Sequence, residues 1–126
     1  MASINEPLNL GDLLKYEEDC LNYSRDQVTV ASSQNLELGA VVGRVTATGK
    51  IKRLDPAATD GTEDVAGILL GAIDATLIER DDALLLARHG IVASNAVVWP
   101  AGITAEQKAT AVAALEARGI LIRQSA

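Results

Sequence analysis

The chain has 126 residues, a formal net charge of −6, no phenylalanine, one tryptophan and two tyrosines. This length suggests a single domain, and the scarcity of aromatic residues predicts a core built from valine, isoleucine, leucine and alanine. The acidic balance, without a cluster of basic residues, argues against direct contact with nucleic acid or with an anionic membrane surface.

The chain contains a single cysteine, Cys20, which excludes an internal disulfide and a metal site built from several cysteines. Its first residues lack the basic and apolar regions of a signal peptide, and its apolar stretches are too short to span a membrane. We therefore expect a soluble protein that is made in the cytoplasm and does not enter membranes.

The first 26 residues differ in composition from the rest of the chain, because polar residues are frequent and the leucines are thinly spread. The run Gly11–Glu18 is long enough for two helical turns, but isolated helices this short are marginal in water. We interpret residues 1–26 as an arm with little core of its own. The alternative interpretation is a first strand and helix that pack on the domain.

The folded domain is predicted to begin at residue 27 with short strands. Gln27–Ala31 alternates between polar and apolar residues, as a half-buried strand does. Ala40–Thr48 and Lys50–Leu54 flank a glycine and are predicted to form a hairpin, with a bulge at Gly43.

The middle of the chain is predicted to continue in short β segments. These are a bent, buried strand over Val65–Ile73, a turn or irregular edge over Asp74–Thr76, a strand over Ala83–His89, and two short segments over Ile91–Ala93 and Ala96–Trp99. Short strands at this spacing favour a barrel-like or sandwich core over alternating β and α units.

One helix near the C-terminus is well specified by its ends. Thr104 and Gln107 have the spacing of a capping box, and Gly119 is the residue type that commonly follows the end of a helix. The residues between them favour a helix, and Ile120–Arg123 is predicted to be a last strand. The predicted fold class is therefore mainly β (α+β), with one C-terminal helix.

No residue pattern in the chain predicts catalysis. His89 and Cys20 would form a nucleophilic pair only if the arm folded over the barrel, and the adjacent Asp81 and Asp82 are expected to lie in an exposed turn. The acidic loop Asp60–Asp64 lacks the spacing of calcium ligands. We therefore expect no enzyme activity, no cofactor and no metal. The alternative is a cytosolic enzyme or small-ligand-binding module on a small β barrel, using His89, Asp81 or Asp82.

Trp99 is the only tryptophan in the chain, and Pro100 follows it directly. Tryptophan is over-represented among the residues that dominate protein interfaces. The pair therefore predicts either a plug in the core or an anchor at an interface between subunits.

Several stretches together resemble a known family. They are GAVVGRVTATGKIKRLDPAATDGTEDVAGILL (residues 39–70) and ARHGIVASNAVVWPAGITAEQKATAVAALEARGILIR (residues 87–123), preceded by the leader segments EPLNLGDLLKYE and YSRDQVTVASSQNLELG. The Asp-Gly-Thr turn before AGIL and the Trp-Pro pair before the helix are the most specific elements. In this order the chain resembles the lambda-type bacteriophage head decoration, or capsid-stabilising, proteins.

The resemblance implies a β-clip-like incomplete barrel with a C-terminal helix (residues 27–126) and an extended N-terminal capsid-binding arm (residues 1–26). It implies a late structural protein without catalytic residues or cofactor, which forms homotrimers on the outer surface of the expanded capsid head of the virion. There it would bind the major capsid (coat) protein and stabilise the head against the pressure of packaged DNA. The arm residues that the resemblance assigns to capsid binding are Glu6, Pro7, Leu8, Leu10, Leu13 and Leu14, and the expected trimer contact is at Trp99 and Pro100.

Overall fold

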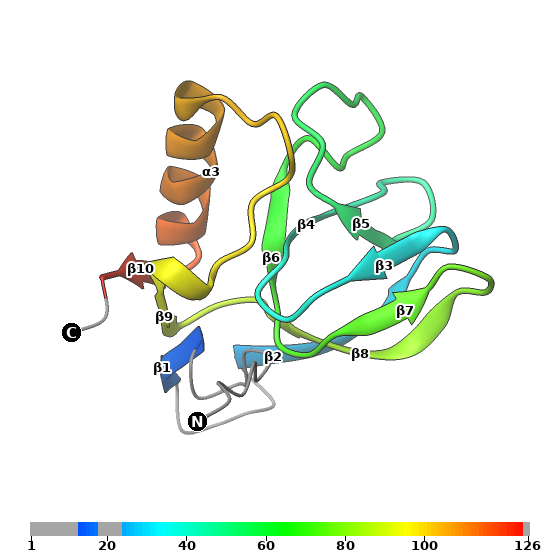
Figure 1. Ribbon diagram of the computed structural model, residues 1–126, viewed down its shortest axis with the longest axis horizontal. Coiled ribbons are helices and arrows are strands. Elements are labelled where there is room, and N and C mark those ends of the chain that lie inside the picture. The colour runs from blue at the N-terminus through cyan, green and yellow to red at the C-terminus, as the bar shows by residue number, and fades with distance from the viewer. Residues whose placement is uncertain (1–12, 18–23, 125–126) are drawn as a thin grey trace, which may run out of the picture.

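Five strands close into a small barrel at the centre of the protein (Figure 1). The computed structural model describes residues 13–17 and 24–124. In barrel order the strands are β2 (Arg25–Val30), β5 (Ile51–Arg53), β4 (Val41–Arg44), β6 (Val65–Leu69) and β8 (Arg80–Leu86). Between β2 and β5 the pairing is limited to Val30 and Ile51. A single pair of residues therefore closes the barrel between these two strands. The mainly β fold class predicted from the sequence is confirmed.

The predicted hairpin is confirmed as the antiparallel pair β4–β5, in which Val42 lies opposite Arg53. The predicted irregularity is also present, because the register of β4 against β6 shifts between Val42 and Gly43. A Cβ at Gly43 would lie 2.6 Å from the backbone of Thr62. The absence of a side chain at this position therefore lets the loop before β6 pack directly against the hairpin.

A two-stranded ribbon, β3 (Gln34–Leu36) with β7 (Ile73–Ala75), lies beside the barrel. Strand β3 was not predicted from the sequence. Asp74 and Ala75, predicted as part of a turn or irregular edge, belong to strand β7. These residues become a strand because they pair with Gln34 and Asn35. Strand β8 also begins earlier than predicted, so Asp81 and Asp82 lie on a strand and not in a turn.

A second, three-stranded sheet has the order β1 (Leu14–Glu17), β9 (Gly90–Ala93) and β10 (Ile120–Arg123). Strands β1 and β9 are antiparallel, and β9 and β10 are parallel. Within the run Gly11–Glu18, which is long enough for two helical turns, Leu14–Glu17 is therefore a strand. Pairing with β9 orders these residues, whereas an isolated helix of this length is marginal in water. The last strand is confirmed.

The helix α3 (Ala105–Ala117) has the predicted capping box. The Gln107 backbone N–H donates to Thr104 Oγ1 at 3.1 Å, and the Gln107 side chain accepts from the Thr104 N–H at 3.0 Å. Gly119 follows the helix with a φ of 78°, in the left-handed region that a helix-ending glycine commonly adopts. The predicted strand over Ala96–Trp99 is wrong, because residues 94–96 form the 3₁₀ turn η1 (Ser94–Ala96) and Val98 makes only a single bridge to Ala40.

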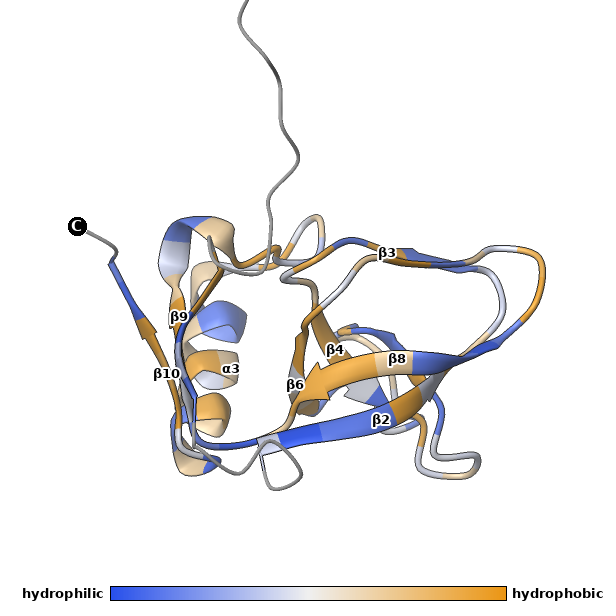
Figure 2. Ribbon diagram, turned by 90° about the horizontal axis from the view of Figure 1, so that it is seen from below, coloured by the Kyte–Doolittle hydropathy of each residue, from blue (hydrophilic) through white to orange (hydrophobic). Residues whose placement is uncertain are grey.

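The apolar residues form two clusters. One fills the barrel and includes Val30, Val42 and Leu85. The other lies between the barrel, the three-stranded sheet and α3, and includes Leu13 and Leu115. Figure 2 shows α3 between the β9–β10 pair and strand β6, where this second cluster lies. The helix thus joins the sheet to the barrel.

Candidate functional site

The polar residues considered for catalysis have separate structural surroundings. The backbone N–H of His89 donates to the Arg118 carbonyl at 3.2 Å, and the His89 ring lies so close to Gly119 that a Cβ there would clash with it. Asp82 is exposed and accepts a hydrogen bond from Arg80 at 2.8 Å, which lowers the pKa of Asp82. Cys20 lies outside the described residues. Within residues 13–17 and 24–124, no group of three or more His, Cys, Asp or Glu residues could hold a metal ion.

The base of the predicted arm is fixed to the domain by one carboxylate. Glu17 Oε2 accepts hydrogen bonds from Arg25 Nε at 2.6 Å and from Ser24 Oγ at 2.8 Å, and Glu17 Oε1 accepts from Arg25 Nη2 at 2.8 Å. The bonds from Arg25 and Ser24 lower the pKa of Glu17, against an opposing effect of burial. We name this group, Glu17 with Ser24 and Arg25, the arm-base clamp, because it ties β1 to the start of β2.

The described part of the predicted arm packs on the domain. Leu13 is fully buried in the cluster beneath α3, and Leu14 packs against the same cluster. Leu13 and Leu14 therefore anchor the chain where it joins β1. The other predicted capsid-binding residues, Glu6, Pro7, Leu8 and Leu10, lie outside the described residues, and the binding role of all six stays a prediction.

We expect the Glu17→Gln variant to lose about 1–3 kcal/mol of unfolding free energy at pH 7, because Arg25 loses its charged, part-buried partner. The native pKa of Glu17 lies below its unfolded value of about 4.3. The stabilisation is therefore present above that value and disappears as the pH falls through the native pKa. Urea unfolding at pH 7 and at successively lower pH should show the two proteins converging in acid.

The matched control is Glu79→Gln, which removes an exposed ion pair with Lys50. Exposed pairs of this kind contribute about 0–1 kcal/mol, so this variant should stay close to the wild type at every pH. An equal loss in the two variants would contradict a specific role for the arm-base clamp.

Trp99 and Pro100 follow a segment that is hydrogen-bonded to β4. Val98 donates to the Gly39 carbonyl at 2.9 Å and accepts from the Val41 N–H at 3.1 Å. Trp99 is half-buried against the cluster beneath α3, and Lys108 Nζ lies 5.3 Å from the centroid of its ring. Trp99 thus contributes to the core and keeps part of its surface exposed. The expected trimer contact at Trp99 and Pro100 stays a prediction.

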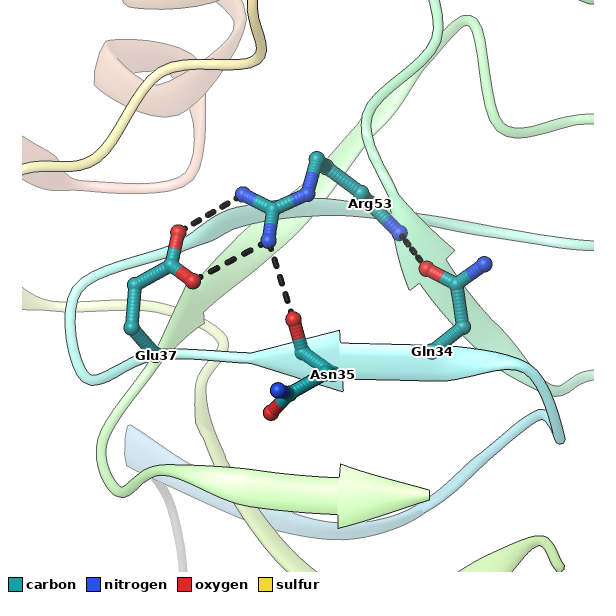
Figure 3. Close-up of polar contacts among 4 residues, drawn as sticks. All are labelled: Gln34, Asn35, Glu37 and Arg53. Atoms are coloured by element: carbon teal, nitrogen blue, oxygen red, sulfur yellow. Dashed lines mark hydrogen bonds and ion pairs between the residues drawn. The ribbon is translucent and has the colours of Figure 1, made fainter. Parts of the chain in front are cut away.

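A groove of about 590 Å³ lies beside Pro100, between β3, β5 and the loop after β5. Its wall is formed by Arg53, whose guanidinium donates to both Glu37 carboxylate oxygens, at 2.8 and 3.1 Å, and to the Asn35 carbonyl at 3.1 Å (Figure 3). The Arg53 backbone N–H donates to Gln34 Oε1 at 3.0 Å. Side chains therefore join β3 to β5 where no backbone ladder does. This site was not predicted from the sequence, since residues 34–36 gave no strand signal.

Four large apolar side chains are exposed among the described residues. They are Tyr16 on β1 (56% exposed), Leu77 (95%) and Ile78 (69%) in the loop between β7 and β8, and Leu84 on β8 (43%). The Leu77–Ile78 pair is the most exposed of these. Exposed apolar side chains that lie together commonly mark an interaction site. Neither residue was singled out from the sequence, and only the structure shows that the pair lies outside both cores.

Comparison with known proteins identifies the family of this chain. The family model for bacteriophage lambda head decoration protein D matches residues 3–120. The chain belongs to this family. A search of the curated proteins found no match to the chain. Membership of the decoration family confirms the resemblance in the sequence and makes the chain a structural component of a phage virion capsid.

The family is one of structural capsid proteins and not one known for enzymes. The decoration family also implies that the chain binds the phage capsid. Among the described residues, no helix is both long and apolar enough to cross a membrane.

Proposed function

We propose that this protein is a homotrimeric decoration protein that binds the outside of the expanded capsid and stabilises it against the pressure of packaged DNA. The observation that carries the proposal is the family match over residues 3–120. The partner is the major capsid protein, and the binding element is the N-terminal arm. The alternative of an enzyme gains no support, because His89 packs against Gly119 while Asp82 pairs with Arg80.

The arm and the domain have separate tasks in this proposal. An extended arm can bind by adding a strand to the edge of a coat-protein sheet. Ordering such an arm costs about 1–2 kcal/mol per residue in backbone entropy, so one arm alone binds weakly. Three arms on one trimer raise the effective concentration and multiply the affinity by about 10²–10⁴. The arm-base clamp supports this, since it ties β1, the strand that follows residues 1–12 in the chain, to the start of β2.

The stabilising function is tested with DNA-filled heads that lack the protein. Added protein should raise the temperature at which the heads release their DNA, because each bound trimer joins neighbouring coat subunits. Release is measured as the DNA that becomes accessible to a nuclease during heating. Heads that bind the protein but release DNA at an unchanged temperature would contradict the stabilising function.

The proposed subunit contact consists of the exposed part of Trp99, which the buried Pro100 follows, and the Leu77–Ile78 pair. We expect the double variant Leu77→Ser, Ile78→Ser to dissociate to monomers at a higher protein concentration than wild type, because burial of each side chain contributes about 1.5–3 kcal/mol. Light scattering over a dilution series measures this, with Leu84→Ser as the matched control on β8. A trimer as stable as that of the control would show that this pair is outside the subunit contact.

A further inference from the structure

The outer face of the three-stranded sheet carries a row of apolar side chains. Ile91 on β9 lies opposite Tyr16 on β1 and opposite Leu121 on β10. Residues directly opposite one another on neighbouring strands share a face, so these three side chains form a line across the sheet. Their chain neighbours Val92 and Ile120 point to the other face and belong to the core. The three side chains of this row are therefore not part of the core, and Tyr16 is 56% exposed.

The row borders a hollow that suits one protein side chain. Tyr16, Ile91 and Leu121 line a space of about 220 Å³, together with His89 and two glycines. Sites for small-molecule ligands usually measure about 300–1,000 Å³, so this hollow is too small for that class. Its lining is mainly apolar, which favours an aliphatic or aromatic side chain as the occupant.

The backbone and charge of the same sheet point to an extended, acidic partner. Strand β10 is an outer strand, and no strand in the described ranges 13–17 and 24–124 pairs with its outer edge. The charged residues of the three strands are Lys15, Glu17 and Arg123, and Glu17 is held by Arg25. Arg123 is an exposed cation on the outer strand of this sheet, in a chain whose net charge is −6. A free strand edge beside an apolar hollow is the arrangement used to bind extended peptides.

We propose that this face binds an extended segment of the coat protein, which adds a strand to the outer edge of β10. The segment places an apolar side chain in the hollow and a carboxylate beside Arg123. This inference rests on the proposed function and adds a second coat contact to that of the arm.

The position of the sheet favours the coat protein over a second copy of this chain. The predicted coat-binding arm leads into β1, so an arm bound to the capsid brings this sheet against it. The Leu77–Ile78 loop between β7 and β8, by contrast, lies at the opposite end of the molecule from β9 and β10 in both ribbon views (Figures 1 and 2). The Leu77–Ile78 part of the proposed subunit contact and the coat contact therefore occupy different ends.

The proposal is tested with the double variant Tyr16→Ala, Leu121→Ser and the single variant Arg123→Glu. Binding of each full-length protein to expanded heads that lack it is measured by co-sedimentation, beside the trimer mass and the unfolding temperature. We expect the double variant to bind at least about tenfold more weakly, as for loss of a central interface contact. Arg123→Glu should bind several-fold more weakly and with an altered salt dependence, since it reverses a charge at the contact. The matched controls Leu84→Ser and Arg44→Glu, on barrel strands, should bind as wild type does.

Hydrogen exchange gives a second measurement, because strand addition should slow exchange of the Ile120–Arg123 amides when the protein is bound to heads.

Folded trimers of both variants that bind within twofold of wild type would overturn the inference and leave the proposed function intact. Variants that fold but no longer form trimers would place this face in the subunit contact and would overturn it as well. If the double variant fails to fold, the binding of Arg123→Glu alone tests the inference. Arg123 lies at the exposed end of β10, so this substitution should leave the fold intact. If the wild-type protein does not bind heads, both the proposed function and this inference are contradicted.

Discussion

Removal of residues 1–12 is expected to weaken binding to expanded heads by at least about 100-fold while leaving the domain folded. The reason is multivalency: three weak arms on one trimer act together, and the whole of that gain disappears with the arms. The measurement is a binding isotherm by co-sedimentation, with the trimer mass and the unfolding temperature determined on the same preparation.

The structure decides where this truncation should end. Leu13 is buried in the core, and Leu14–Glu17 forms the strand β1 that pairs with β9. A deletion that continues through residue 17 removes a core leucine, a strand and the arm-base clamp, so its loss of binding would be mixed with a loss of stability. The matched comparison is therefore removal of residues 1–12 against removal of residues 1–17. A protein that lacks residues 1–12 and binds as wild type does would contradict the arm assignment.

Leu13→Ala is expected to lower the unfolding free energy by about 2–5 kcal/mol, because it leaves a cavity in the cluster beneath α3. Urea unfolding measures the change. Leu84→Ala is the control, since Leu84 is 43% exposed and surface substitutions usually change stability by less than about 0.5 kcal/mol.

The same variant distinguishes two roles for Leu13. Sequence resemblance assigns Leu13 to capsid binding, whereas the structure buries it in the domain core. If Leu13→Ala leaves stability unchanged but weakens binding to heads, the anchoring role is wrong and the residue contacts the coat protein.

The parts of the fold that sequence predicts are those set by local interactions. The helix α3 is recognisable because Thr104, Gln107 and Gly119 mark its ends within a few residues of chain. The β4–β5 hairpin is recognisable for the same reason, since its two strands follow one another. The strands β1, β3 and β7 were missed or misassigned because each has only three or four residues and gains its hydrogen bonds from a partner distant in the chain.

The candidate surfaces also divide into those visible in the local sequence and those formed by residues distant in the chain. The Trp99–Pro100 pair is visible in the sequence because tryptophan is rare in this chain. The arm-base clamp, the Arg53 groove and the Tyr16–Ile91–Leu121 row are not, because each depends on residues that only strand pairing brings together. The arm was interpreted from the composition of the first 26 residues, and its capsid-binding role comes from the resemblance to the decoration family.

We propose that this protein binds the outer surface of the capsid as a trimer. Cryo-electron microscopy of expanded heads that lack the protein, reconstructed with and without added full-length protein, tests this proposal. We predict additional threefold-symmetric density on the outside of the shell, joined to the coat subunits by the arms. No added density, or density only on the inside of the shell, would contradict the claim.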